Sequence, residues 1–321
     1  MSQTMKLFSA NSISQSPFSI IKLTDETSHS SVEIYAKGAL LNGFHVQLKN
    51  GEYQNIIDGH TSPAEMPANE KWFKSSKLSP FACRLHNSEY NFNGKSYKTG
   101  KYFTGTEALH GLLYDADFIV ESLNSNDEHA SVTILYTYDK TEEGFPFKYE
   151  CRVIYTLGAG NRLTVDTVIK NTGTESMPVT DGWHPYFALG NKVNDWQFFI
   201  HTESMLEFNE YLLPTGKQIA GNRFSSMKQI GDTSLDNSFV LKDFNTPSCR
   251  LYNPVNGLSL EIENSSSYPY LQVFIPDHRN SMAIEALSAP PDALNNKIHL
   301  DVLQPGDEKK YSVSYCVSCS E

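Results

Sequence analysis

The 321-residue sequence predicts an all-β protein, on three observations. Apolar and polar residues alternate in segments such as 131–138 and 147–157, which is the period of half-buried strands. Strand patterns recur from near the start of the chain to its end. No stretch of twelve or more residues keeps the apolar spacing of an amphipathic helix, which excludes β-α-β units and the nucleotide-binding folds built from them.

The predicted strands follow one another along the chain. They cover 31–37, 45–50, 131–138, 147–157, 162–171, 196–202, 259–264, 270–276, 281–287 and 310–318. The turn residues GAGN join two of these segments, so 147–171 is predicted to form one long antiparallel hairpin. Residues 58–80 are rich in turn formers and charge and are expected to form a long surface loop. Nothing divides the strand pattern, so we expect one domain over 1–321.

Composition and charge limit the possible partners. The chain carries 26 Lys and Arg residues against 37 Asp and Glu residues, a formal net charge of -11, and would repel the phosphate backbone of nucleic acid. The sequence has no signal-peptide core and no apolar run of about 18 residues, so we expect no membrane partner and a cytoplasmic location. A monomer and a homodimer are both compatible with the sequence.

Motifs for metals and cofactors are mostly missing. The five cysteines are scattered, which favours reduced thiols. Cys316 and Cys319 form a C-x-x-C, but it lies in an alternating pattern without a second pair, which favours a coincidence of strand sequence over a redox or zinc site. No phosphate-binding, zinc-protease or nucleophile-elbow motif occurs, and no H-x-H pair. We expect no metal and no cofactor.

The segment DGWHPYFALG contains a histidine in unusual surroundings. His184 precedes Pro185, which restricts it to extended conformations and predicts a strand end or edge. Trp183, Tyr186 and Phe187 are residues that stack on flat apolar faces, including those of sugars. By itself, the segment favours a histidine packed in the core over a functional one.

Four further polar residues are candidates for a site. His110 precedes Gly111 and can occupy a tight turn. Glu285 interrupts an apolar strand, where it is either a carboxylate with a raised pKa suited to acid-base chemistry or an outward-facing residue of a half-exposed strand. Arg84 follows an apolar trio and could point into a cleft or form a rim salt bridge. Asp236 could hold sugar hydroxyls or cap a turn.

Taken in chain order, these residues resemble the site residues of the aldose 1-epimerase (galactose mutarotase) family. The segments that carry the resemblance are CRLHNSEYNFNGKSY from Cys83, LHG at 109–111, WHPYFAL at 183–189, DNSFVL at 236–241 and EALSAPPDALNN from Glu285. Each segment is a weak signal, but their order along the chain makes a strong combined one.

The resemblance implies a fold and an activity. The fold is a large antiparallel β-sandwich, the galactose mutarotase-like supersandwich, which agrees with the predicted strands. The activity is interconversion of the α and β anomers of a monosaccharide by ring opening, without metal or redox cofactor. Carried over by position, Glu285 would be the general base and His184 the general acid. Arg84 and His110 would hold the sugar ring, and Asp236 would bind ring hydroxyls.

The sequence departs from the family pattern at three positions. Cys83, Trp183 and Ala188 stand where the family usually has asparagine, so each position loses a hydrogen-bonding amide. The acid-base pair is retained, which leads to the hypothesis that the reaction is kept and the sugar preference has changed. We expect Trp183 to contribute to substrate binding, by narrowing the pocket or adding a stacking surface.

Two alternative functions remain at this point. A phosphosugar 1-epimerase of the same fold would carry an arginine shortly after the His-Gly pair, whereas Leu112, Leu113 and Tyr114 follow here. A non-catalytic carbohydrate-binding protein would keep the cleft without turnover, and loss of Glu285 or His184 would have favoured it. Both residues are present.

Overall fold

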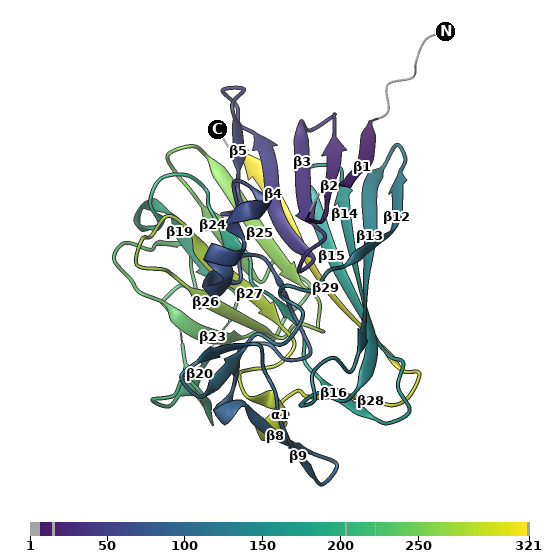
Figure 1. The fold of residues 1–321 in the computed structure, drawn as a ribbon. Helices are drawn as coiled ribbons and strands as arrows, with labels where there is room; N and C mark the ends of the chain where they lie inside the picture. The colour runs from purple at the N-terminus through teal and green to yellow at the C-terminus, as the bar shows by residue number, and fades with distance from the viewer. Residues whose placement is uncertain (1–6, 15–16, 203, 222, 320–321) are drawn as a thin grey trace.

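The computed structural model describes residues 7–14, 17–202, 204–221 and 223–319. Its named strands pair in antiparallel fashion, as the alternating sequence predicts (Figure 1). The helical segments are short: η1 (Pro63–Glu65), η2 (Pro67–Trp72), η3 (His86–Ser88), η4 (Val193–Asp195) and α1 (Ala293–Asn296). None of the helices in the described residues has the length and apolar character needed to cross a membrane.

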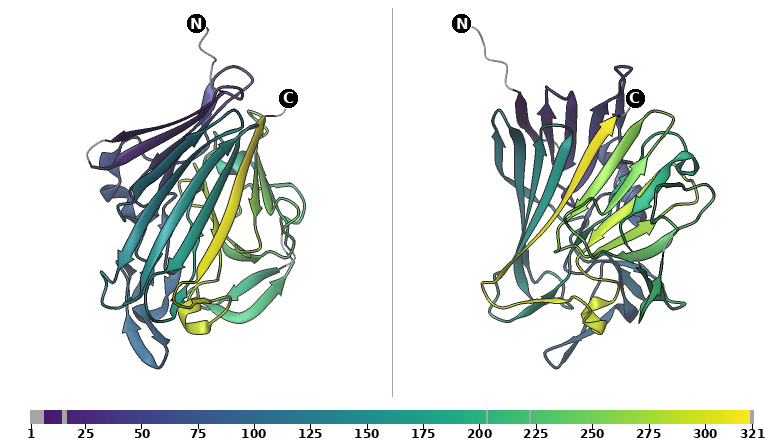
Figure 2. Two further views of the ribbon diagram at one scale, coloured as in Figure 1. Left: turned by 90° about the vertical axis from the view of Figure 1, so that its right-hand side faces the viewer. Right: turned by 180° about the vertical axis from the view of Figure 1, so that it is seen from behind.

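The largest sheet has nine strands and contains the longest strands of the chain. In spatial order they are β12 (Ile119–Ser125), β13 (His129–Asp139), β14 (Lys148–Gly158), β15 (Arg162–Asn171), β29 (Glu308–Cys319), β25 (Leu258–Asn264), β24 (Cys249–Tyr252), β19 (Gln197–Ile200) and β22 (Lys228–Gln229). β14 and β15 form the antiparallel hairpin that the sequence predicts. Figure 2 shows β29 running beside β15, which brings the C-terminal part of the chain into the middle of the sheet.

A second sheet of eight strands faces the first. Its order is β21 (Pro214–Ala220), β20 (Ser204–Phe208), β23 (Asp236–Val240), β26 (Tyr270–Phe274), β27 (Met282–Leu287), β17 (Gly182–Trp183) and β6 (Lys77–Leu78), and β18 (Tyr186–Phe187) also pairs with β27. The two sheets meet through buried side chains. Phe187 packs against Tyr315 at 5.3 Å between ring centroids, and Trp183 packs against Tyr155 at 5.9 Å.

The N-terminal part of the chain forms a five-stranded sheet that packs against β12, β13 and β14. Its strands, in order, are β1 (Phe8–Ser14), β2 (Ser19–Asp25), β3 (Ser30–Tyr35), β4 (Leu40–Gln47) and β5 (Tyr53–Asn55). The smaller sheets are β10 (Tyr102–Thr104), β11 (Glu107–Leu109) and β7 (Arg84–Leu85); β16 (Met177–Val179) and β28 (Asp301–Leu303); and β8 (Glu89–Phe92) and β9 (Lys95–Lys98). One large cluster of buried apolar side chains joins the three main sheets.

Residues 58–80 differ in part from the expected surface loop. Their first part contains η1 and η2 and is largely exposed or half-buried, but residues 75–80 are buried and include β6 at the end of the eight-stranded sheet. The reason lies in Lys77, whose ammonium group forms a buried ion pair with Asp181 at 2.5 Å. The charge of Lys77, which contributed to the prediction of a surface loop, is therefore not a sign of exposure to solvent.

The C-x-x-C pair lies on β29, as the alternating pattern predicts. Cys316 and Cys319 are both free, and neither thiol is fully buried. The Cys316 sulfur accepts a hydrogen bond from Arg162, and the Cys319 thiol donates to the carbonyl of Asn256. These local contacts are those of strand residues.

Candidate active site

Glu285 lies in the middle of β27, and all six residues of this strand are buried. The alternative of an outward-facing glutamate is therefore wrong, because only 3% of the residue is exposed. β26 lies on one side of β27 and places Gln272 directly opposite Glu285. On the other side are β17 and β18, the two short strands on either side of His184.

His184 occupies the break between β17 and β18. Pro185 cannot donate a backbone hydrogen bond, but its carbonyl accepts one from Ile284 of β27. The carbonyl of His184 accepts a hydrogen bond from Ser75. These contacts fix the backbone so that His184 Nε2 lies 3.3 Å from Glu285 Oε1.

Arg84 and His110 come from the three-stranded sheet. Arg84 in β7 pairs with Leu109 in β11, and His110 follows β11 directly. His110 has a left-handed backbone with φ 60°, held by a hydrogen bond from its amide to the carbonyl of Cys83. Gly111 continues the turn at φ 76°, where a Cβ atom would lie 2.3 Å from the carbonyl oxygen of Ser79. The turn therefore requires glycine.

Asp236 begins β23 and is linked to the centre of the sheet by Gln272. The Gln272 amide donates a 2.7 Å hydrogen bond to Asp236 Oδ1, while its carbonyl oxygen accepts one from Ser238. Gln272 pairs with Ser238 on one side and with Glu285 on the other. A short row of polar side chains thus crosses three neighbouring strands on one face of the sheet.

Aromatic residues surround the two histidines. The rings of His184 and His110 meet edge to face at 5.0 Å, and Tyr186 stacks on His184 at the same distance. Phe73 follows η2 and packs on His110 at 4.5 Å. Trp72 approaches Tyr186 edge to face at 6.3 Å. The segment 58–80 therefore reaches the site and supplies part of its wall.

One cavity of about 250 Å³ collects these side chains, and we call it the acid-base cavity. It is lined by Arg84, His110, His184, Asp236 and Glu285, together with Lys71, Trp72, Phe73, Cys83, Leu109, Tyr186, Phe208, Leu212, Gln272, Phe274 and Pro291. Five residues that lie as far as 201 positions apart in the sequence, from 84 to 285, thus share one cavity.

The sequence matches a known protein family over most of its length. The family described as Aldose 1-epimerase matches residues 19–316, which is most of the chain. The chain belongs to this family.

Relatives within and around the family are distant in sequence. The chain is 27% identical over 251 residues to the uncharacterized protein YihR of Escherichia coli strain K12, covering 76% of this chain and 78% of that protein. It is 21% identical to human galactose mutarotase over 252 residues, covering 76% and 71% of the two chains. The crystal structure of galactose 1-epimerase from Lactobacillus acidophilus NCFM superimposes with a TM-score of 0.82 at 19% identity, covering 99% and 100%. The fold is therefore the galactose mutarotase-like sandwich that the resemblance implied.

Burial shifts the pKa values of the acid-base pair in opposite directions. Desolvation raises the pKa of Glu285 well above its usual range, and the charge of Asp236 raises it further. Desolvation lowers the pKa of His184 to about 4. Both effects favour the neutral form of each side chain, and they reverse the ordinary order of the two groups, so that the pKa of Glu285 lies above that of His184.

The neighbouring ionisable groups are also perturbed. Burial lowers the pKa of His110 well below its usual value, and the charges of His184 and Arg84 act in the same direction. Asp236 is exposed at the cavity mouth, but its carboxylate faces the cavity, where desolvation raises its pKa. Arg84 and the hydrogen bond from Gln272 oppose this increase. These shifts favour the neutral form of both histidines in the empty cavity.

Three polar atoms in the cavity have no hydrogen-bond partner among the described residues. They are Glu285 Oε2, His184 Nδ1 and His110 Nδ1. Buried polar atoms are nearly always paired, and a histidine that served only for packing would be expected to have partners for both ring nitrogens. These unpaired atoms favour a site that a polar ligand completes.

Trp183 lies elsewhere, against expectation. It is 2% exposed, does not line the acid-base cavity, and packs between the sheets against Tyr155 and under the Lys77 ammonium, 4.2 Å from the ring centroid. Successive strand residues face opposite sides of a sheet, so His184 on the cavity side places Trp183 on the core side. The expectation that Trp183 contacts the sugar directly is therefore wrong, and its ring instead packs behind His184.

Two groups of lining residues escaped the sequence analysis. Gln272 has no local signal, because its place at the site depends on cross-strand register with Glu285. Trp72 and Phe73 lie in a segment that was expected to be a loop, and the aromatic pair within a polar stretch was the signal that could have identified them.

Among the described residues, no group of three or more His, Cys, Asp or Glu side chains is arranged to hold a metal ion.

Proposed function

We propose that the protein is an aldose 1-epimerase that interconverts the α and β anomers of a monosaccharide, with Glu285 as base and His184 as acid. The observation that carries the proposal is the 3.3 Å approach of His184 Nε2 to Glu285 Oε1 inside a buried cavity. That cavity also contains Arg84, His110 and Asp236, whose donors and acceptors suit the hydroxyl groups of a sugar.

The chemistry requires two proton transfers. Glu285 removes the proton from the anomeric hydroxyl while protonated His184 delivers a proton to the ring oxygen. The bond between the anomeric carbon and the ring oxygen breaks, and the anomeric carbon becomes an aldehyde. Rotation about the adjacent carbon–carbon bond presents the other face of the aldehyde. Ring closure then returns both protons with the two roles reversed.

The pKa directions define the resting state of this pair. In the empty cavity, burial favours a protonated Glu285 and a neutral His184. These shifts place the pKa of Glu285 above that of His184, so moving the shared proton from Glu285 to His184 costs free energy that contacts with a bound sugar must offset. The resulting carboxylate and imidazolium are the forms in which the base and the acid act.

The charges in the cavity argue against a phosphosugar as substrate. A phosphate group needs several free cationic or amide donors. Arg84 and Lys71 line the cavity, but the carboxylates of Glu285 and Asp236 lie there too. Leu112, Leu113 and Tyr114, which follow the His-Gly turn, are buried apolar or aromatic residues. A neutral sugar therefore suits this balance of charge better.

We also propose a cytoplasmic location, in line with five free cysteines.

Polarimetry on a panel of pure anomers of common aldoses tests the activity. We expect at least one sugar to reach equilibrium rotation much faster with the protein than in buffer alone. Mutarotation of every sugar at its uncatalysed rate would contradict the proposed function.

The Glu285→Gln variant separates an enzyme from a carbohydrate-binding protein. Gln keeps the size of the side chain but cannot accept the anomeric proton, so the rate should fall by about 10²-fold or more while sugar binding persists. The exposed turn residue Glu128 provides the matched control, because Glu128→Gln changes the same charge outside the site. Equal rates in Glu285→Gln and the parent would show that the base is a different residue.

A further inference from the structure

A second and larger cavity lies next to the acid-base cavity. Its volume is about 770 Å³, and we call it the outer chamber. Trp72 and Tyr186 line both cavities, so they form a shared wall. Tyr186 and Ala188 both face the chamber, whereas Phe187 between them is buried in the core between the sheets. Side chains 186–188 therefore point alternately to the chamber and to the core, and Tyr186 and Ala188 form part of the wall of the chamber.

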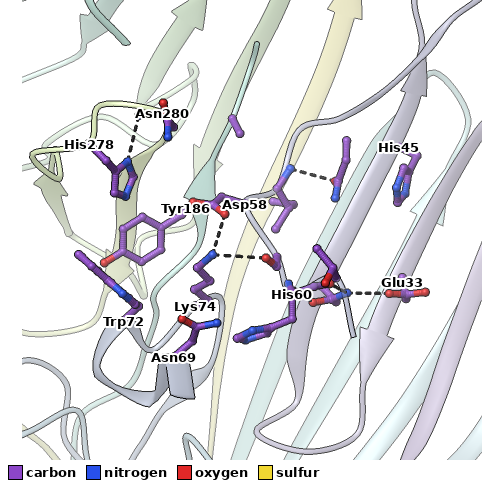
Figure 3. Close-up of a pocket in the computed structure, with 16 residues that line it drawn as sticks. Glu33, His45, Asp58, His60, Asn69, Trp72, Lys74, Tyr186, His278 and Asn280 are labelled. Atoms are coloured by element: carbon purple, nitrogen blue, oxygen red, sulfur yellow. Dashed lines mark hydrogen bonds and ion pairs between the residues drawn. The ribbon is translucent and has the colours of Figure 1, made fainter. Parts of the chain in front are cut away.

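The chamber has one aromatic side and one polar side. Figure 3 shows Trp72, Tyr186 and His278 together at one side and Glu33 and His45 at the other. The rings of Trp72 and His278 meet at 5.8 Å, which fixes the position of the indole. Flat aromatic surfaces beside polar groups are the combination that binds the C–H faces and the hydroxyls of a sugar.

The polar groups of the chamber are held by hydrogen bonds. Lys74 Nζ lies 2.7 Å from Asp58 Oδ1, and Ser281 donates a hydrogen bond to Asp58 Oδ2. The amide of Asn42 donates to Glu33 and to the carbonyl of His60. These side chains are preorganised, so binding a ligand does not require ordering them first.

The charge of the chamber favours a neutral ligand. Lys74 is already paired with Asp58, and Glu33 adds a second carboxylate. An anionic ligand would meet these carboxylates without a free cation to offset them. The buried His60 Nδ1 has no hydrogen-bond partner among the described residues, which leaves one polar atom beside the chamber unsatisfied. Hydroxyl groups can both donate to and accept from such neighbours.

We infer that the outer chamber is a second sugar subsite and that the preferred substrate is a reducing disaccharide or a longer saccharide. This inference rests on the proposed function. The reducing ring lies in the acid-base cavity, and the next ring lies in the outer chamber, packed against the shared wall of Trp72 and Tyr186. The acid-base cavity, at about 250 Å³, is smaller than the ~300–1,000 Å³ of common ligand sites and suits a single ring. The chamber supplies the space for the second ring.

A variant that fills the chamber tests the inference. Ala188→Phe places a ring in the outer chamber from a position that does not line the acid-base cavity. Ala220→Phe is the matched control, because Ala220 is exposed on β21 and lines neither cavity. The substrates are glucose, galactose and a panel of reducing disaccharides with the glycosidic bond at each non-anomeric hydroxyl of the reducing ring in turn.

We expect at least one disaccharide to show a kcat/KM about tenfold or more above that of its own reducing monosaccharide, as one or two added hydrogen bonds and a stacking contact would give. Ala188→Phe should abolish this advantage and leave the monosaccharide rate within about twofold, and Ala220→Phe should change neither. The inference is wrong if monosaccharides are turned over and no disaccharide has an advantage, or if Ala188→Phe slows both substrates equally.

A binding measurement separates this inference from the proposed function. Saturation-transfer NMR reports which ring protons of a disaccharide contact the protein. Contact by both rings that Ala188→Phe reduces to one ring would support the subsite even if no sugar were turned over. Turnover of a monosaccharide together with contact by only the reducing ring would overturn the subsite and leave the proposed function intact.

Discussion

Asp236 and Glu285 show how one carboxylate adjusts another. Burial is the main cause of the raised pKa of Glu285, and the charge of Asp236 adds to it. Gln272 lies between them, donating to Asp236 and pairing in register with Glu285. Asp236 is exposed at the cavity mouth, so solvent screens its effect. Both effects favour the protonated form of Glu285, which holds the proton that the acid-base pair shares.

Asp236→Asn should move the alkaline limb of the pH profile. The pair acts with one shared proton, which Glu285 holds in the empty cavity, so kcat/KM falls as the pH rises through the pKa of Glu285, which lies above 4.5. Removing the charge of Asp236 lowers that pKa, and the limb should move to lower pH by up to about one unit, whatever happens to the absolute rate. The measurement is kcat/KM against pH for both proteins. A limb that stays in place or moves to higher pH would exclude this coupling.

Glu285→Gln should stabilise the protein at neutral pH. Because the pKa of Glu285 is higher in the folded than in the unfolded chain, the folded state binds more protons between these two values. Ionising Glu285 therefore reduces the stability of the parent as the pH rises above 4.5, and glutamine avoids this cost. We expect a gain of about 1–3 kcal/mol at neutral pH that disappears near pH 4, measured by urea unfolding. A variant less stable than the parent at every pH would contradict the raised pKa.

At the scale of elements, a buried ion pair joins β6 to the start of β17 behind His184. Lys77 Nζ contacts Asp181 and donates to the carbonyl of Gly182, and it lies over the ring of Trp183. Tyr268 donates a 2.6 Å hydrogen bond to Asp181. Both charged side chains are fully buried. The pair fixes the short strand that precedes His184, which explains how a two-residue strand can hold the adjoining site residue in place.

Lys77→Met should destabilise the protein strongly. It leaves the Asp181 carboxylate buried without its cation, and removing one partner of a buried pair costs about 3–5 kcal/mol. Adding Asp181→Asn should recover part of this loss, because the unpaired charge is gone. Lys22→Met, on an exposed position of β2, is the control. Chemical denaturation of the three variants measures the effect, and a double variant less stable than Lys77→Met alone would contradict the ion-pair account.

The sequence allowed the prediction of those elements whose pattern is local. The alternation in residues 147–171 predicts the hairpin of β14 and β15, and the pattern of 281–287 predicts β27. The two-residue strands β6, β7, β17 and β18 carry too few residues to show any period. Gln272 depends on register between distant segments, which no local pattern contains. Trp183 was misplaced because the resemblance outweighed the alternation that puts it opposite His184.

At the scale of the whole molecule, the sandwich brings distant parts of the chain to one cavity. The eight-stranded sheet supplies His184, Asp236 and Glu285 on one face, while its other face packs on the nine-stranded sheet through residues such as Phe187. The three-stranded sheet and the segment 58–80 close the cavity from the opposite side with Arg84, His110 and aromatic rings. We propose that the whole chain acts as one domain, because the cavity needs all of these parts.

The central claim is the division of roles between Glu285 and His184, and a crystal structure with a bound monosaccharide tests it most directly. The account predicts a Glu285 carboxylate oxygen within hydrogen-bond distance of the anomeric hydroxyl and His184 Nε2 within hydrogen-bond distance of the ring oxygen, about 2.6–3.2 Å in each case. A sugar bound in the acid-base cavity with its anomeric carbon directed away from Glu285, or with its ring oxygen out of reach of His184, would contradict it.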